Sequence, residues 1–277
     1  MCRWIAYIGK PISMDTLVTK PSRSLIEQSL NSQLSFRPDG SVLATNGDGF
    51  GMGWYGERAE PGLFKVPSPA WNNENITELC AQISSRLFMA HIRAASVGAI
   101  QRTNVHPFKY KNWLFQHNGY VGEFEKLRRD LQFDIAPELY TQLSGTTDSE
   151  TLFLLALTYG LEQHPKQAFE KTIRRVLDLC DAYGINPDII LSCAISDGQS
   201  LYTLRYSSST RVHSQYYATH AECLRELNAD NATMPRNSVV VVSEPLDQSG
   251  ALWQEMPSNS FATFAAGEAR IEELRIA

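Results

Sequence analysis

CRWIAYIG, residues 2–9, begins with a cysteine and continues by alternating small or apolar residues with larger ones. The alternation predicts an opening strand, which we expect Gly9 and Pro11 to end. Initiator methionine is normally removed before a small residue, so Cys2 would carry a thiol and a free α-amine. Such an amine titrates near ~7.7–8.0 and can act as a base close to neutral pH. Cys2 is therefore a candidate activated nucleophile, although any protein can begin with Met-Cys.

The composition excludes several classes of protein. The chain has 277 residues, 43% hydrophobic and 20% charged, which suits one large domain or two small ones. A net charge of −5 disfavours nucleic acid and anionic membranes as partners. No apolar run reaches the ~20 residues of a membrane span, and the N-terminus does not resemble a signal peptide. The five cysteines are odd in number, scattered and without a CxxC pair, which favours a reducing, cytoplasmic location.

Hydrophobic periodicity predicts an α+β fold. We expect helices at 22–32, 75–86, 124–131, 148–162 and 166–182, and strands at 2–9, 50–56, 87–94, 113–117, 189–198, 200–206, 238–246 and 261–271. Strands precede and follow the two central helices, without a regular βαβ rhythm. This order favours stacked sheets flanked by helices.

Two alternative kinds of site are disfavoured. NGDGFGMG, residues 46–53, is glycine-rich, but an aromatic strand pattern follows it instead of a helix, and no Gly-Lys-Ser/Thr ending is present. We therefore interpret it as backbone lining a pocket or a strand entry, not as a nucleotide loop. His91, His106 and His117 suggest a metal site, but they lack short ligand spacing.

Three further segments carry candidate site residues, each with a structural alternative. Arg93 ends an apolar strand in HIRAAS, where its fork can grip a carboxylate with Ser96 nearby, or form an ion pair. In QHNGY, Asn118 and Gly119 can form an oxyanion hole, or the tight turn of a hairpin. In GTTDSET, Asp148 can bind a substrate ammonium, or cap the following helix.

Taken in order, the Met-Cys terminus, GDGFG, HIRAAS, NVHPF, HNG and TDSE resemble the class II glutamine amidotransferases. The resemblance implies the four-layer αββα sandwich of the N-terminal-nucleophile hydrolases. It implies a single glutamine amidotransferase type 2 domain over residues 1–277, with the mature chain starting at Cys2. It calls for no cofactor and no metal ion.

The resemblance also implies roles for individual residues. Cys2 matches the nucleophile, and Asn118 with Gly119 matches the oxyanion hole. Arg93 and Ser96 match the positions that hold the glutamine α-carboxylate. Asp148 matches the acid that binds the α-amino group, and His106 matches the histidine-proline pair that borders the pocket.

Other motifs are similar to those of one branch of the family. MCRxxxYxGxP, PAWNN (Pro69–Asn73), TNVHPF and VVSEPL (Val241–Leu246) resemble stand-alone members. These include the amidohydrolase of ergothioneine biosynthesis and the amidotransferase-like subunit of the fungal glutathione-degradation complex. Synthetase-linked relatives usually have a tryptophan directly after the arginine. This chain has Ala94, which would leave room for a longer leaving group.

We therefore expect an enzyme that hydrolyses a small γ-glutamyl compound. Residues after Pro257 suffice only to finish a sheet, so no ammonia-accepting domain is expected within the chain. One alternative is a glutaminase subunit that delivers ammonia to an acceptor or partner subunit. Another is a non-catalytic assembly subunit. The leaving group, a homo-oligomeric state and retention of Met1 are left open by the sequence.

Overall fold

Two antiparallel sheets stack face to face between two layers of helices. The computed structural model describes residues 2–34, 45–95, 98–219, 237–247, 253–265 and 268–276. In this part of the chain, the first sheet has seven strands in the order β11 (Gln254–Glu255), β9 (Tyr216–Ala218), β10 (Val239–Val242), β1 (Arg3–Ser13), β4 (Ser84–Ile92), β2 (Phe50–Trp54) and β3 (Gly62–Val66). The second has six, in the order β13 (Glu268–Glu273), β12 (Ser260–Ala265), β8 (Leu201–Ser207), β7 (Ile189–Ser196), β6 (Trp113–Val121) and β5 (Phe108–Tyr110).

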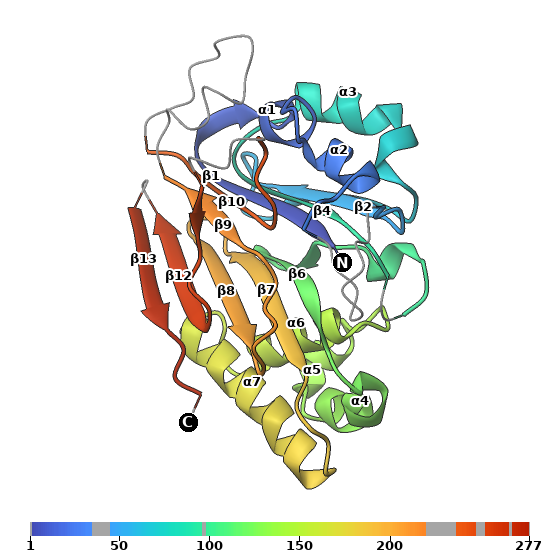
Figure 1. Cartoon of the computed structure of the whole chain (residues 1–277), viewed down its shortest axis with the longest axis vertical. Coiled ribbons are helices and arrows are strands. Elements are labelled where there is room, and N and C mark those ends of the chain that lie inside the picture. Colours follow the sequence, from blue (N-terminus) through green and yellow to red (C-terminus); the bar gives the residue numbers. More distant parts are fainter. Residues whose placement is uncertain are drawn as a thin grey trace.

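The helices cover the outer faces of both sheets (Figure 1). The first sheet carries α1 (Asp15–Val18), α2 (Leu25–Leu30) and α3 (Glu74–Gln82). The second carries α4 (Phe124–Phe133), α5 (Pro137–Tyr140), α6 (Asp148–Thr158) and α7 (Pro165–Ala182). The α+β fold and its four-layer αββα sandwich are thus confirmed. None of the helices in the described ranges is long and apolar enough to cross a membrane.

Strand β1 shows how alternation builds the layers. Trp4, Ala6 and Ile8 pack between the two sheets. Ile5 and Tyr7 point the other way, into the core beneath α1–α3. Successive side chains of a strand face opposite sides, so Cys2 continues the face that Trp4 presents to the second sheet. The start of β1 therefore brings the candidate nucleophile to the space between the sheets.

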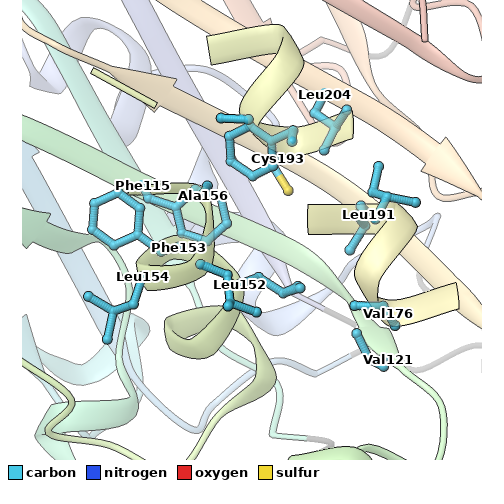
Figure 2. Packing of buried hydrophobic residues seen from close by; sticks show 14 of the residues in the cluster. Phe115, Val121, Leu152, Phe153, Leu154, Ala156, Val176, Leu191, Cys193 and Leu204 are labelled. Carbon is cyan, nitrogen blue, oxygen red and sulfur yellow. The ribbon is translucent and has the colours of Figure 1, made fainter. Parts of the chain in front are cut away.

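A third core lies between the second sheet and α4–α7. Figure 2 shows this packing, in which side chains of α6 meet those of β6 and β7. The rings of Phe115 and Phe153 stack with centroids 5.3 Å apart. This apolar contact fixes α6 against β6, the two elements that carry Asp148 and Asn118.

Most predicted elements are present, but several boundaries were wrong. Strand β1 does not end at Gly9 or Pro11; it continues to Ser13, and a register shift between Ile8 and Ile12 accommodates the change. Residues 84–86 belong to β4 and not to the preceding helix, because Ser84 and Ser85 pair with the end of β1. The segment 261–271 forms two strands, β12 and β13, which pair with each other.

Candidate active site

The Cys2 thiol lies against the main chain of Ala94. The register of β1 and β4 pairs Arg3 with Ile92, so Cys2 meets the residues that follow β4. The Ala94 N–H donates to Cys2 Sγ at 3.4 Å, and Sγ lies 3.6 Å from the Ala94 carbonyl oxygen. The thiol is half-buried. It is held by backbone on one side while part of it stays accessible.

The glycine-rich segment holds this backbone in place. Asp48 N–H donates to the Arg93 carbonyl at 3.0 Å, and Arg93 N–H donates to the Gly49 carbonyl at 2.8 Å. The Asp48 carboxylate accepts the N–H of Ala95 at 2.7 Å. A Cβ on Gly51 would lie 2.0 Å from the His106 carbonyl oxygen, so only glycine allows this approach. The segment enters strand β2, in agreement with its interpretation as a strand entry.

Arg93 follows β4 directly and is 3% exposed. Its guanidinium donates to the carbonyls of Gly98 at 3.3 Å and Ala99 at 3.1 Å. Asn104 Nδ2 donates to the same Ala99 carbonyl and to Thr146 Oγ1, and Asn104 Oδ1 accepts the N–H of Thr146 at 2.8 Å. Asn104 therefore ties the loop around Arg93 to the segment that precedes Asp148.

Charges from three separate segments act on Arg93. Burial lowers the pKa of the Arg93 guanidinium, while negative charge on Cys2, Asp48 and Asp148 acts in the opposite direction. The fold thus brings Cys2, Arg93 and Asp148 into one electrostatic neighbourhood, although they lie far apart in sequence. Ser96 lies outside the described residues.

Asp148 is the first residue of α6 and is 4% exposed. The interpretation of Asp148 as the helix cap was wrong, because Thr147 is the cap and its side chain accepts the N–H of Glu150. The Asp148 carboxylate accepts Val121 N–H at 2.9 Å and Ser149 N–H at 2.7 Å. These donors fix the carboxylate between α6 and the end of β6.

Asn118 and Gly119 lie within β6 and not in a hairpin turn, so that alternative was wrong. The strand runs through them in unbroken register with β7, pairing Asn118 with Ser192 and Gly119 with Leu191. Asn118 is 1% exposed, and neither its Oδ1 nor its Nδ2 has a hydrogen-bond partner among the described residues. A Cβ on Gly119 would lie 1.9 Å from the Ile190 carbonyl oxygen. Buried amides are normally paired, so the Asn118 amide has hydrogen-bonding capacity that a bound molecule could use.

The three histidines gather in the interior. The rings of His91 and His106 stack with centroids 4.2 Å apart, and His91 Nε2 lies 3.0 Å from the His117 carbonyl oxygen. Burial lowers the pKa of all three, that of His91 to about 3. His106 is 3% exposed, and neither ring nitrogen has a hydrogen-bond partner in the described ranges. No group of three or more potential metal ligands occurs in the part of the chain that the structure describes.

Two features near the site were missed from the sequence. Arg3 donates to the Cys2 carbonyl at 2.8 Å and pairs with Glu244. His213 Nδ1 lies 3.4 Å from the Asn118 carbonyl oxygen, and burial lowers the pKa of His213 to about 3. The sequence could have indicated Glu244, because it follows an apolar strand in VVSEPL just as Arg93 follows one in HIRAAS. No sequence pattern indicated His213.

A surface cleft of about 480 Å³ lies elsewhere, between the start of α7 and strands β8, β12 and β13. None of its lining residues is among the predicted site residues.

Comparison with known proteins identifies the family. The family model for class-II glutamine amidotransferases matches residues 17–275. The probable glutamine amidotransferase DUG3 of Saccharomyces cerevisiae is 32% identical over 297 residues, covering 95% of this chain and 81% of the relative. The γ-glutamyl-hercynylcysteine sulfoxide hydrolase of Mycolicibacterium smegmatis is 26% identical over 213 residues, covering 76% of this chain and 82% of the relative.

Solved structures agree. A glutamine aminotransferase class-II domain protein from Silicibacter pomeroyi has 34% identity and a TM-score of 0.72, with 99% of each chain covered. The glutamine phosphoribosylpyrophosphate amidotransferase of B. subtilis has 14% identity and a TM-score of 0.62, over 99% of this chain and 50% of its own, which supports the fold alone. The two curated relatives match the branch predicted from the motifs. The chain belongs to the class-II glutamine amidotransferases.

Proposed function

We propose that this enzyme hydrolyses the γ-glutamyl amide bond of a small γ-glutamyl compound, with Cys2 as the nucleophile. The observation that carries the proposal is the position of the Cys2 thiol. It lies against Ala94, directly beside Arg93, and Arg93 also interacts electrostatically with Asp148. A cation near a half-buried thiol, with an anion within electrostatic reach of that cation, suits an amino-acid head whose side-chain carbonyl reaches sulfur.

The chemistry uses the two groups of Cys2 itself. Once Met1 is removed, the α-amine takes the thiol proton, because such an amine titrates near ~7.7–8.0. The thiolate attacks the γ-carbonyl, and a carbon–sulfur bond forms. The protonated amine then gives its proton to the leaving nitrogen as the carbon–nitrogen bond breaks. Water hydrolyses the resulting γ-glutamyl thioester, which releases glutamate and restores the thiol.

In the proposed mechanism, Asn118 and Gly119 stabilise the oxyanion. The support is the buried Asn118 amide, which has no hydrogen-bond partner in the described residues. Its Nδ2 and the Gly119 N–H would donate to the negative oxygen of the tetrahedral intermediate. Removing one such donor typically costs ~3–4 kcal/mol in the transition state.

Arg93 and Asp148 would bind the amino-acid head of the substrate. Arg93 would pair with the α-carboxylate through two hydrogen bonds, with the Ser96 hydroxyl as an added donor. Asp148 would accept from the α-ammonium, since Val121 and Ser149 already orient its carboxylate. His106, whose ring nitrogens are unpaired among the described residues, would border the pocket.

We favour simple hydrolysis, in which the amine is released into solution, over delivery of ammonia to a partner subunit. One of the two curated relatives is named as a γ-glutamyl-hercynylcysteine sulfoxide hydrolase, and the other as a probable glutamine amidotransferase. Ala94 leaves more room beside the thiol than a tryptophan would. A longer leaving group than ammonia should therefore fit.

The test is turnover by the full chain after removal of Met1, verified by mass spectrometry of the N-terminal peptide. Substrates would run from glutamine through γ-glutamyl amines to glutathione, with glutamate release as the readout. We expect one glutamate and one free amine per turnover, with larger leaving groups tolerated or preferred. A chain that retains one residue before Cys2 is the matched control, and it should be inactive while folded. Strict preference for glutamine with activation by a partner would establish an ammonia-delivering subunit instead. No turnover of any substrate by the processed chain would favour an assembly subunit.

A further inference from the structure

The guanidinium of Arg3 is fully buried beside the candidate nucleophile. Arg3 is 0% exposed, and its Nη1 donates to the Cys2 carbonyl oxygen at 2.8 Å. Its Nε donates to Glu244 Oε2 and to Ser32 Oγ, both at 2.8 Å. Arg3 lies on the face of β1 opposite Trp4, so it reaches this position from behind the thiol.

Glu244 is held as a carboxylate by several partners. It pairs with Arg23 as well as Arg3, and it accepts the N–H groups of Gln33 and Leu34, both at 3.1 Å. Burial alone would raise the pKa of Glu244, but Arg3 and these donors hold the pKa below its usual value. Two guanidinium groups therefore share one carboxylate. The buried cluster carries a net positive charge directly behind Cys2.

We propose that Arg3 is a positioning residue that both tethers Cys2 and uses its positive charge to keep the amine and thiol of Cys2 less protonated at neutral pH. This inference rests on the proposed function of Cys2. A nearby cation disfavours an ammonium and favours a thiolate. Because the amine and thiol interact, they titrate in two macroscopic steps that belong to the pair. A cation lowers both steps, whichever group holds the shared proton.

Other charged groups face the same region and set the size of the effect. Arg93 interacts electrostatically with Cys2 and adds a second positive charge, and Asp48 and Asp148 in turn act on Arg93. His213 interacts with Arg3 but is neutral, since burial lowers the pKa of His213 to about 3. Arg3 is distinguished from Arg93 by its direct hydrogen bond to Cys2. Its removal should therefore act on Cys2 without removing a predicted substrate contact.

The experiment compares pH profiles of kcat/KM for Met1-processed wild type, Arg3→Met and Arg3→Lys, with a γ-glutamyl anilide as the substrate. In Arg3→Met, both limbs of the profile should move to higher pH by ~0.5–1 unit, less than the ~1–3 units of a full charge at close distance, because Glu244 neutralises part of the Arg3 charge. Arg3→Lys keeps the charge, so its limbs should stay near those of wild type. Both variants should have a lower kcat, because the fork that binds the Cys2 carbonyl is lost.

Glu244→Gln gives a test of opposite sign and covers the case in which Arg3→Met does not fold. It removes the negative charge but keeps an oxygen that can accept from Arg3. The limbs should then move to lower pH. General loosening of the structure cannot produce shifts of opposite sign in these two variants. Lower activity with unshifted limbs in both variants would show that Arg3 is only a structural pin, and would overturn the proposal.

A readout without turnover separates this proposal from the proposed function. The alkylation rate of the Cys2 thiol by iodoacetamide, followed on the N-terminal peptide by mass spectrometry, reports its titration directly. Arg3→Met should shift that titration upward even if the enzyme had no γ-glutamyl activity. If Cys2→Ala keeps full turnover, the proposed function fails while the alkylation result on Arg3 stands by itself.

Discussion

The main-chain N–H of Ala94 donates to the sulfur of Cys2 across 3.4 Å, although 92 residues separate the two. The residue after Arg93 is thus the one whose backbone touches the candidate nucleophile. Its side chain is buried, with 9% exposure. The size of this side chain should affect what can approach the thiol.

Ala94→Trp should narrow the range of leaving groups. We expect kcat/KM for glutathione to fall at least tenfold more than kcat/KM for glutamine, because added volume in a packed site typically costs ~1–3 kcal/mol. The measurement is glutamate release from both substrates. Ala94→Ser is the control of similar size, and its selectivity should match that of wild type. An equal loss on both substrates would mean that the side chain at 94 does not face the leaving group.

Cys2 should be the cysteine that reacts with a glutamine-mimicking diazo-ketone. Burial raises the pKa of Cys80 to about 12, raises that of Cys180, and raises that of Cys193 well above its usual value. Thiols of this kind are poor nucleophiles at neutral pH. One label is expected on the N-terminal peptide, and Cys2→Ala should abolish both labelling and turnover. Labelling at Cys80, Cys180 or Cys193, or at Cys223 outside the described residues, would contradict the assignment.

Arg93→Lys and Asp148→Asn should each lower kcat/KM by an amount equivalent to ~1–3 kcal/mol of transition-state binding. Lysine keeps the charge of Arg93 but loses its two-pronged grip on a carboxylate. Asparagine at 148 loses the charge that would bind an α-ammonium. With a substrate analogue that lacks the α-amine, Asp148→Asn should cost much less, whereas Arg93→Lys should cost the same. Equal losses for both variants on that analogue would limit Asp148 to a structural role.

The stability of the fold should decrease steeply as the pH falls below about 6.5. Burial lowers the pKa of His91 to about 3, so between that value and ~6.5 the unfolded chain binds a proton that the folded chain does not. The contribution of His91 to the unfolding free energy is fully present above the pKa of the unfolded state. It is lost at about 1.4 kcal/mol per pH unit as the pH falls towards the pKa of the folded state.

His91→Gln should reduce this pH dependence by about one proton. Urea unfolding at pH 7, 6 and 5 gives the slope of the unfolding free energy. Glutamine retains a side-chain N–H that can donate to the His117 carbonyl. His164 is exposed, so His164→Gln is the matched control and should leave the slope unchanged. An unchanged slope in His91→Gln would show that His91 does not titrate on unfolding.

The sequence predicted what local patterns determine. Alternation identified the strand around Trp4, and α2 lies within the helix predicted at 22–32, with Ser24 as its cap accepting the N–H of Glu27. Long-range pairing overrode local preference elsewhere. Asn118 and Gly119 have strong turn propensity, but pairing with β7 keeps them in a continuous strand.

Candidate site residues could be proposed from the sequence where the side-chain chemistry itself suggests a role, as for Cys2, Arg93 and Asp148. The structure places Cys2 and Asp148 within electrostatic reach of Arg93, while the roles of all three in a site stay predictions. Asn104 was missed because it contributes by connecting two loops through hydrogen bonds to a residue 42 positions away, which no local pattern shows. Arg3 and Glu244 were missed for the same reason, because 241 residues separate them.

The contact between Arg3 and Glu244 also has a consequence for synthesis of the chain. Cys2 leaves the ribosome first, whereas Glu244 follows β10, which must insert beside β1 before the carboxylate can reach Arg3 (Figure 1). During translation the thiol and amine are already present, but the cluster that orients them is incomplete. If Arg3 acts as proposed, the full reactivity of Cys2 is therefore delayed until the chain has been made at least as far as Glu244.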